Sequence, residues 1–91
     1  MNQLSIKNIS IFKPIYMDKN QFLQSFAEQF DETDPSAITT DTKFKEMDEW
    51  SSMIALMIIA MVDENYNKKI TGADLRETET IGQLFERLSA K

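Results

Sequence analysis

The stretch WSSMIALMIIAMV, from Trp50 to Val62, decides the fold, because two serines stand directly before ten consecutive apolar residues. The apolar run and the polar residues after it predict a helix that begins at Ser51 or Ser52 and ends near Tyr66. The first turn of a helix has unpaired N–H groups and a partial positive charge, so a serine there is well placed to carry a phosphate. The alternative is structural, since serine is also a preferred N-cap.

The continuous apolar run does not show directly which face of this helix is buried. Counting back from Tyr66 in helical steps predicts an inward stripe of Ala55, Ile58 or Ile59, and Val62. The opposite face then presents apolar side chains to solvent, and such a patch on an acidic protein indicates an interaction surface unless another helix covers it. The residues that we expect to bind a partner are Met53, Leu56, Met57, Ala60, Asp63 and Glu64.

A helix before this segment is predicted from its cap. Asp18, with Gln21 three residues further on, can begin a helix that extends to about Phe30, and Met17 and Phe22 are spaced as a hydrophobic staple. A long connection follows over residues 31–49, and its spaced apolar residues indicate that it is held against the core. These anchors are Ile38, Phe44 and Met47.

Two further capping patterns lie near the end of the chain. Thr71 with Asp74 can cap a short turn, and Thr80 with Gln83 can begin a last helix, in which Gly82 permits the close approach of a neighbour. The inward face of that last helix would hold Ile81, Leu84, Phe85 and Leu88. The sequence therefore predicts an all-α fold, a small four-helix bundle of three main helices and one short helix, with a long first loop.

Composition limits the size and the chemistry of the protein. Its 91 residues suit one helical domain over residues 18–91, preceded by an N-terminal extension, residues 1–17, that is either a mobile arm or a small added segment. The chain has no histidine and no cysteine, which removes the imidazole base, the thiolate nucleophile and the usual zinc ligands. We therefore expect neither an enzyme nor a metal site.

Charge and hydropathy indicate which partners to expect. The net charge is −5, and residues 18–91 carry eight basic and 15 acidic side chains, a balance of −7. This balance argues against nucleic acid and anionic membranes and favours basic partners. The apolar run is about half as long as a membrane-spanning helix requires. The N-terminus does not have the pattern of a signal peptide, so a cytoplasmic monomer is expected.

Several short motifs follow one another in a single ungapped register. They are Ile38-Thr39-x-Asp41-Thr42-x-Phe44-x-x-Met47, Trp50-Ser51-Ser52-Met53, Asp63-Glu64-x-Tyr66, Ile70, and Thr80-Ile81-Gly82-x-Leu84. In this order and spacing the chain resembles the acyl carrier protein family over about residues 18–91. Ser51-Ser52-Met53 stands where that family usually has Asp-Ser-Leu.

The resemblance implies that Ser52 bears a covalent 4′-phosphopantetheine. Such a protein is not an enzyme: it holds acyl intermediates as thioesters on that arm and presents them to fatty-acid or polyketide-type biosynthetic enzymes. The implied partners are a holo-synthase (a phosphopantetheinyl transferase), which uses coenzyme A and magnesium, and acyl-processing enzymes with basic or apolar docking surfaces. Attachment at Ser51 is the alternative.

The chain departs from the family in its second main helix. Ile54, Met57 and Met61 precede the first acidic residues, whereas the family usually displays several acids there. We therefore expect docking to depend more on apolar contact, with acidic residues flanking it. Those flanking residues are Asp48, Glu49, Asp63 and Glu64.

Two other functions remain open at this stage. Residues 63–74 match much of an EF-hand calcium loop, with oxygen ligands at Asp63, Asn65, Asn67 and Asp74, but Lys68 stands where the loop requires glycine. The other possibility is a non-enzymatic helical adaptor, in which the apolar face binds a partner helix and the serines only cap.

Overall fold

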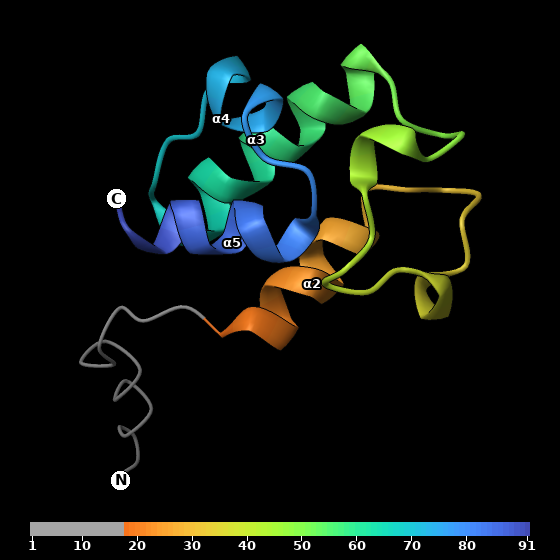
Figure 1. Ribbon diagram of the computed structural model, residues 1–91. Coiled ribbons are helices and arrows are strands. Elements are labelled where there is room, and N and C mark those ends of the chain that lie inside the picture. Colours follow the sequence, from red (N-terminus) through yellow and green to blue (C-terminus); the bar gives the residue numbers. More distant parts are fainter. Residues whose placement is uncertain (1–17) are drawn as a thin grey trace, which may run out of the picture.

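The computed structural model describes residues 18–91, and within this range it forms an all-α bundle (Figure 1). Three main helices and one short helix make up the bundle, as predicted, and no strand forms among these residues. The elements in chain order are α2 (Lys19–Ala27), the 3-10 turns η2 (Pro35–Ala37) and η3 (Phe44–Glu46), α3 (Ser52–Tyr66), α4 (Gly72–Arg76) and α5 (Ile81–Ser89). The expectations for residues 1–17, and for the Met17 staple, lie outside the described residues.

The helices begin where their capping residues stand. Thr71 and Asp74 form a complete capping box at α4, and Thr80 and Gln83 form another at α5, so both predicted boxes are confirmed. Asp18 caps α2 by accepting a hydrogen bond from the backbone N–H of Asn20 at 2.9 Å. At this helix the described residues show no reciprocal bond from a third-position side chain, so the box predicted there is only half formed.

Helix α3 ends where its backbone turns left-handed. Asn67 has φ 53° and ψ 39°, and its N–H donates to the carbonyl of Asp63. Asparagine tolerates this conformation better than most residues, so it is a suitable C-cap. The helix therefore ends at Tyr66, as the change from apolar to polar residues predicted.

Helix α2 is shorter than predicted. Its α-helical residues stop at Ala27, and tighter turns follow in which Gln29 donates to Phe26 O and Phe30 to Ala27 O. This tightening allows Phe30 to pack inward, where its ring stacks on Phe26 with centroids 5.8 Å apart. The prediction of a helix to about Phe30 was therefore wrong for the last three residues, although the chain still coils through them.

The core lies where α2 packs against α3 and α5, and where α4 packs against α5. Its centre consists of side chains that have no exposed surface, which are Phe22, Phe26, Phe44, Ile58, Val62, Ile81, Leu84 and Leu88. Phe44 comes from the long connection, and Ile38 from the same connection is also buried. The connection is thus held against the core by two of its predicted anchors, while Met47 is half-buried.

Candidate functional site

The N-terminus of α3 separates the roles of its two serines. Ser51 is the N-cap, with an extended backbone, and its Oγ accepts the N–H of Ile54 at 3.2 Å. Ser52 is the first helical residue; it is exposed, and its hydroxyl bonds to no other residue within 18–91. The N–H groups of Ser52 and Met53 have no acceptor inside the helix because of their position in its first turn. A group attached to Ser52 Oγ would therefore lie beside free backbone donors.

Trp50 fixes the chain just before these serines. Its indole lies edge-on to Phe44, with centroids 5.1 Å apart, and stacks on Phe30 at 6.5 Å. Its backbone N–H donates to Met47 O at 3.0 Å. These contacts connect the start of α3 directly to the aromatic core.

Glu49 connects the chain before α3 to the segment that follows α2. From the sequence it was expected to be a charge flanking the docking surface. Its carboxylate accepts backbone N–H bonds from Asp31 at 2.7 Å, Glu32 at 3.2 Å and Thr33 at 3.0 Å, and the Thr33 hydroxyl at 2.8 Å. Hydrogen bonding, chiefly from the Thr33 side chain, holds the pKa of Glu49 below its ordinary value. Glu49, which was expected only as a charge flanking the docking surface, therefore also holds the segment that follows α2. Asp48 is exposed.

The exposed side of α3 carries the predicted apolar residues. Met53 is 68% exposed, Leu56 66% and Met57 36%, and these are the large hydrophobic side chains exposed in residues 18–91. Ala60, Asp63 and Glu64 are also exposed. The six residues expected to bind a partner therefore all lie at the surface, and we call Met53, Leu56 and Met57 the apolar stripe.

The buried side of α3 is wider than predicted. Ile58 and Val62 face the core as expected, but Ile54 and Met61 are also buried, at 8% and 6% exposure. The predicted inward stripe included neither Ile54 nor Met61, so their burial was not predicted. A helix held between α2 and the rest of the core buries more than one narrow stripe, and ten apolar residues in a row contain no polar position to mark its edge.

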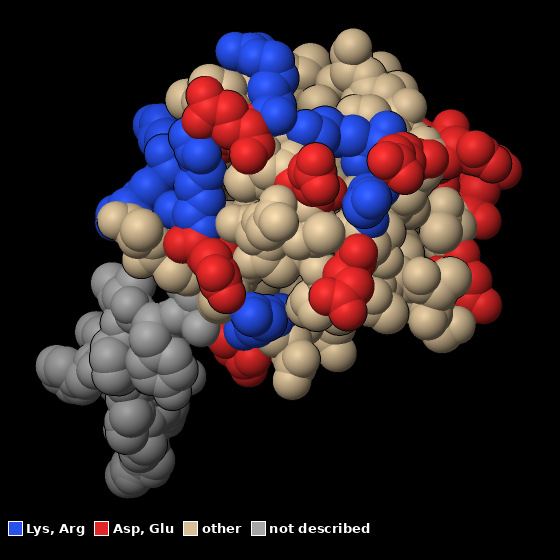
Figure 2. Space-filling view, viewed as in Figure 1, with Lys and Arg blue, Asp and Glu red and all other residues tan. Residues whose placement is uncertain are grey.

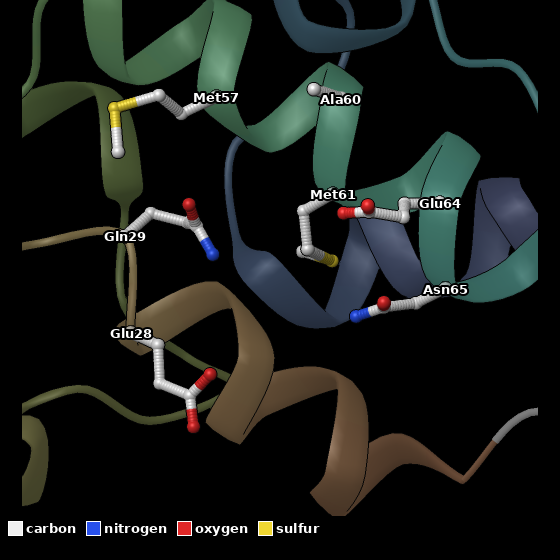
Figure 3. A pocket seen from close by; sticks show the side chains of 7 residues that line it. All are labelled: Glu28, Gln29, Met57, Ala60, Met61, Glu64 and Asn65. Carbon is white, nitrogen blue, oxygen red and sulfur yellow. The ribbon is translucent and has the colours of Figure 1, made fainter.

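A groove of about 360 Å³ lies beside the apolar stripe, between the end of α2 and α3 (Figure 3). Glu28 and Gln29 form one wall, and Met57, Ala60, Met61, Glu64 and Asn65 line the side that belongs to α3. Met57, Ala60 and Met61 contribute apolar atoms to the groove, but its exposed lining is mostly polar, and each side carries a glutamate. A ligand that suits both the groove and the adjoining apolar stripe would combine positive charge with an apolar group.

Charge is unevenly distributed over the surface. Figure 2 shows basic side chains gathered on the side where the C-terminus lies, and acidic side chains along the opposite side. Lys68, Lys69 and Lys91 line one shallow pocket, and Lys69 Nζ lies 3.4 Å from Asp63 Oδ2. Glu64 has no ion-pair partner among the described residues. Of the two acids at the end of α3, Glu64 is thus the one whose charge is unpaired in the described part of the chain.

The residues of the calcium-loop pattern are engaged elsewhere. Asp63 and Asn65 lie inside α3, while Asp74 is buried and contacts Arg87 Nε at 2.6 Å and Lys91 Nζ at 3.1 Å. No group of three or more acidic side chains in residues 18–91 is arranged to hold a metal ion. The structure therefore does not bring the four ligands of this pattern together as an EF-hand loop would.

Comparisons with known proteins found no matching family model, no matching curated protein and no matching solved structure. Within residues 18–91, no helix has the length and hydropathy that crossing a membrane requires.

Proposed function

We propose that this protein is a carrier of acyl groups, held as thioesters on a 4′-phosphopantetheine arm attached to Ser52. The observation that carries the proposal is that the hydroxyls of the two serines at the start of α3 have different contacts. Ser51 Oγ is occupied by the N–H of Ile54, whereas Ser52 Oγ is exposed and has no partner among the described residues. Ser52 can therefore be modified without the loss of the cap.

The residues at this site suit a phosphate-linked group. The N–H groups of Ser52 and Met53 and the positive end of the α3 dipole favour a negative charge beside the Ser52 side chain. The chain contains no cysteine, and the attached arm would supply the thiol that it lacks. Ser51 is a weaker candidate for attachment, because modification of its oxygen would disturb the hydrogen bond to Ile54.

The apolar stripe supports the same proposal, because a carrier must be recognised by several enzymes near its modified serine. Met53 directly follows Ser52, and Leu56 and Met57 lie one turn further along the same helix. We propose that the holo-synthase and acyl-processing enzymes of fatty-acid or polyketide-type synthesis bind here. Glu64 supplies the charge that favours basic docking surfaces.

The test is modification of the purified protein with coenzyme A, magnesium and a promiscuous phosphopantetheinyl transferase, followed by intact mass and fragmentation. One added phosphopantetheine on Ser52 is expected, with none on Ser52→Ala and continued addition on Ser51→Ala. Circular dichroism of both variants checks that each is folded. Addition that survives in Ser52→Ala and is lost in Ser51→Ala would place the attachment at Ser51.

A second candidate is a helical adaptor, which the exposed apolar stripe also favours. This function predicts an unmodified chain that nevertheless binds a partner through α3. A folded wild-type protein that gains no mass with several transferases would overturn the carrier proposal and support the adaptor.

A further inference from the structure

The apolar stripe and the adjoining groove form one continuous surface, which is apolar along the stripe and carries two glutamates in the groove. All the large hydrophobic side chains that are exposed in residues 18–91 lie on the stripe, and Met57 belongs to both features. Figure 3 shows the groove open between the two helices, with Met61 at its floor. Within residues 18–91, no helix covers this surface.

The charge of the groove restricts the occupant. Its lining includes Glu28 and Glu64 and no lysine or arginine. Residues 1–17 have the complementary composition, with Lys7 and Lys13 and no acidic residue, whereas residues 18–91 carry a balance of −7. The same segment is rich in large apolar side chains, which are Leu4, Ile6, Ile9, Ile11, Phe12, Ile15 and Tyr16.

The length of this segment is sufficient for it to reach the groove. Residue 18 precedes the first turn of α2, and the groove lies at the other end of that helix, where Glu28 follows Ala27. A helix of nine residues is about 14 Å long, while 17 extended residues can span about 56 Å. The segment can therefore turn back along α2 and still cover both the groove and the stripe.

We propose that residues 1–17 bind the surface formed by the α3 stripe and the α2–α3 groove of the same molecule. Their apolar side chains cover Met57 and its neighbours, and Lys7 and Lys13 lie near Glu28 and Glu64. This contact makes the N-terminal segment a competitor for any partner that docks on α3. It does not depend on modification of Ser52, so it can be tested without coenzyme A.

The absence of cysteine makes the test selective, because a single introduced cysteine carries the only label. A nitroxide attached to Ser10→Cys, and separately to Ser5→Cys, should strongly weaken the amide NMR signals of Met57, Ala60 and Glu64. The reference is the same sample after the nitroxide has been chemically reduced to its diamagnetic form. The matched control carries the same label together with Ile9→Asp and Ile11→Asp, which should restore those intensities. Equal intensities in the labelled protein and its control would overturn the proposal.

A mixed sample separates this contact from pairing of two copies. Unlabelled ¹⁵N protein is combined with spin-labelled ¹⁴N protein, and the intramolecular contact predicts no loss of intensity. Loss at Met57 and Glu64 in the mixture would show that the segment binds a second copy instead, and would also overturn the proposal. Neither result alters the expected modification of Ser52.

Discussion

Gly82 donates its backbone N–H to the carbonyl oxygen of Thr40 at 2.8 Å, and a Cβ at position 82 would lie 3.2 Å from that same oxygen. Two further contacts accompany this one: Ile81 N–H donates to Thr42 O at 3.2 Å, and Lys43 forms an isolated bridge with Thr80. The start of α5 is thus joined to the long connection by backbone contacts. Glycine at position 82 suits this close approach of two backbone segments, because a Cβ there would crowd the Thr40 carbonyl oxygen.

Replacement of Gly82 by alanine should destabilise the protein. Alanine gains about 0.5–1 kcal/mol in helix propensity, but crowding against a backbone oxygen costs about 1–3 kcal/mol. We expect a net loss of about 1 kcal/mol in the free energy of unfolding, measured with urea. Gly72→Ala is the matched control, because its Cβ would meet only the flexible end of Arg76, at 3.1 Å. Equal stabilisation by both substitutions would contradict the expected crowding.

The two serines at the start of α3 should differ in their effect on stability. Ser51→Ala removes the cap on the Ile54 N–H and should lower the free energy of unfolding by about 1 kcal/mol. Ser52→Ala removes an exposed hydroxyl and should remain within about 0.5 kcal/mol of the wild type. Urea denaturation of the unmodified proteins measures both. A larger loss for Ser52→Ala would make Ser52 a structural residue.

Substitutions on α3 should show whether docking depends on apolar contact. Met57→Lys should weaken binding to a transferase more than about tenfold, while Glu64→Ala, at the rim, should weaken it about threefold or less. Isothermal titration calorimetry measures the affinity of both variants. Met61→Lys is the contrast, because Met61 is buried and a lysine there should unfold the protein rather than weaken docking alone. The opposite order for Met57 and Glu64 would indicate electrostatic docking.

Removal of the Glu49 carboxylate should loosen the segment after α2. Glu49→Ala eliminates the acceptor for the N–H groups of Asp31, Glu32 and Thr33, so those amides should exchange with solvent faster. Hydrogen exchange by NMR gives the rates. Asp48→Ala removes an exposed neighbouring carboxylate and should leave them unchanged. If Asp48→Ala had the same effect, general charge rather than these hydrogen bonds would hold the segment.

The Asp74 ion pairs should make stability depend on pH in acid. Burial opposes ionisation of Asp74, but hydrogen bonds from Arg87, the Thr71 N–H and Lys91 outweigh it and lower its pKa below the ordinary 3.8. The resulting stabilisation is complete above pH 3.8, the ordinary pKa, and is lost as the pH falls through the lower pKa of the folded state.

Asp74→Asn should therefore cost about 2 kcal/mol at neutral pH and should flatten the decline of stability below pH 4. Urea unfolding at several pH values measures the free energy of unfolding, with Asp48→Asn as a control at an exposed carboxylate. If the free energy of unfolding of Asp74→Asn fell with decreasing pH as steeply as that of the wild type, other carboxylates would determine the acid sensitivity.

The sequence predicts best those features that depend on neighbouring residues. The boxes of Thr71 with Asp74 and Thr80 with Gln83 form as expected, because each is completed within four residues. The close approach of a neighbour at Gly82 was also predicted, although the partner, Thr40, became known only from the fold.

Features that depend on distant contacts were missed. Glu49 binds backbone groups 16 to 18 residues earlier, and Arg87 reaches Asp74 across 13 residues, so no local spacing marks either pair. The burial of Ile54 and Met61 was missed because an unbroken apolar run has no periodicity to read. The exposure of Met53 and Leu56 was predicted because the polar residues after the run set the helical phase.

Trp50 is the only tryptophan in the chain, and it lies two residues before Ser52 with its ring against Phe30 and Phe44. An indole that is half-buried in such a setting changes its emission when the ring contacts or the water around it change. The protein therefore contains an intrinsic fluorophore beside the N-terminus of α3. Its emission can follow unfolding in real time without any introduced dye, and the proposed attachment at Ser52 and the proposed partner binding can be tested with the same signal.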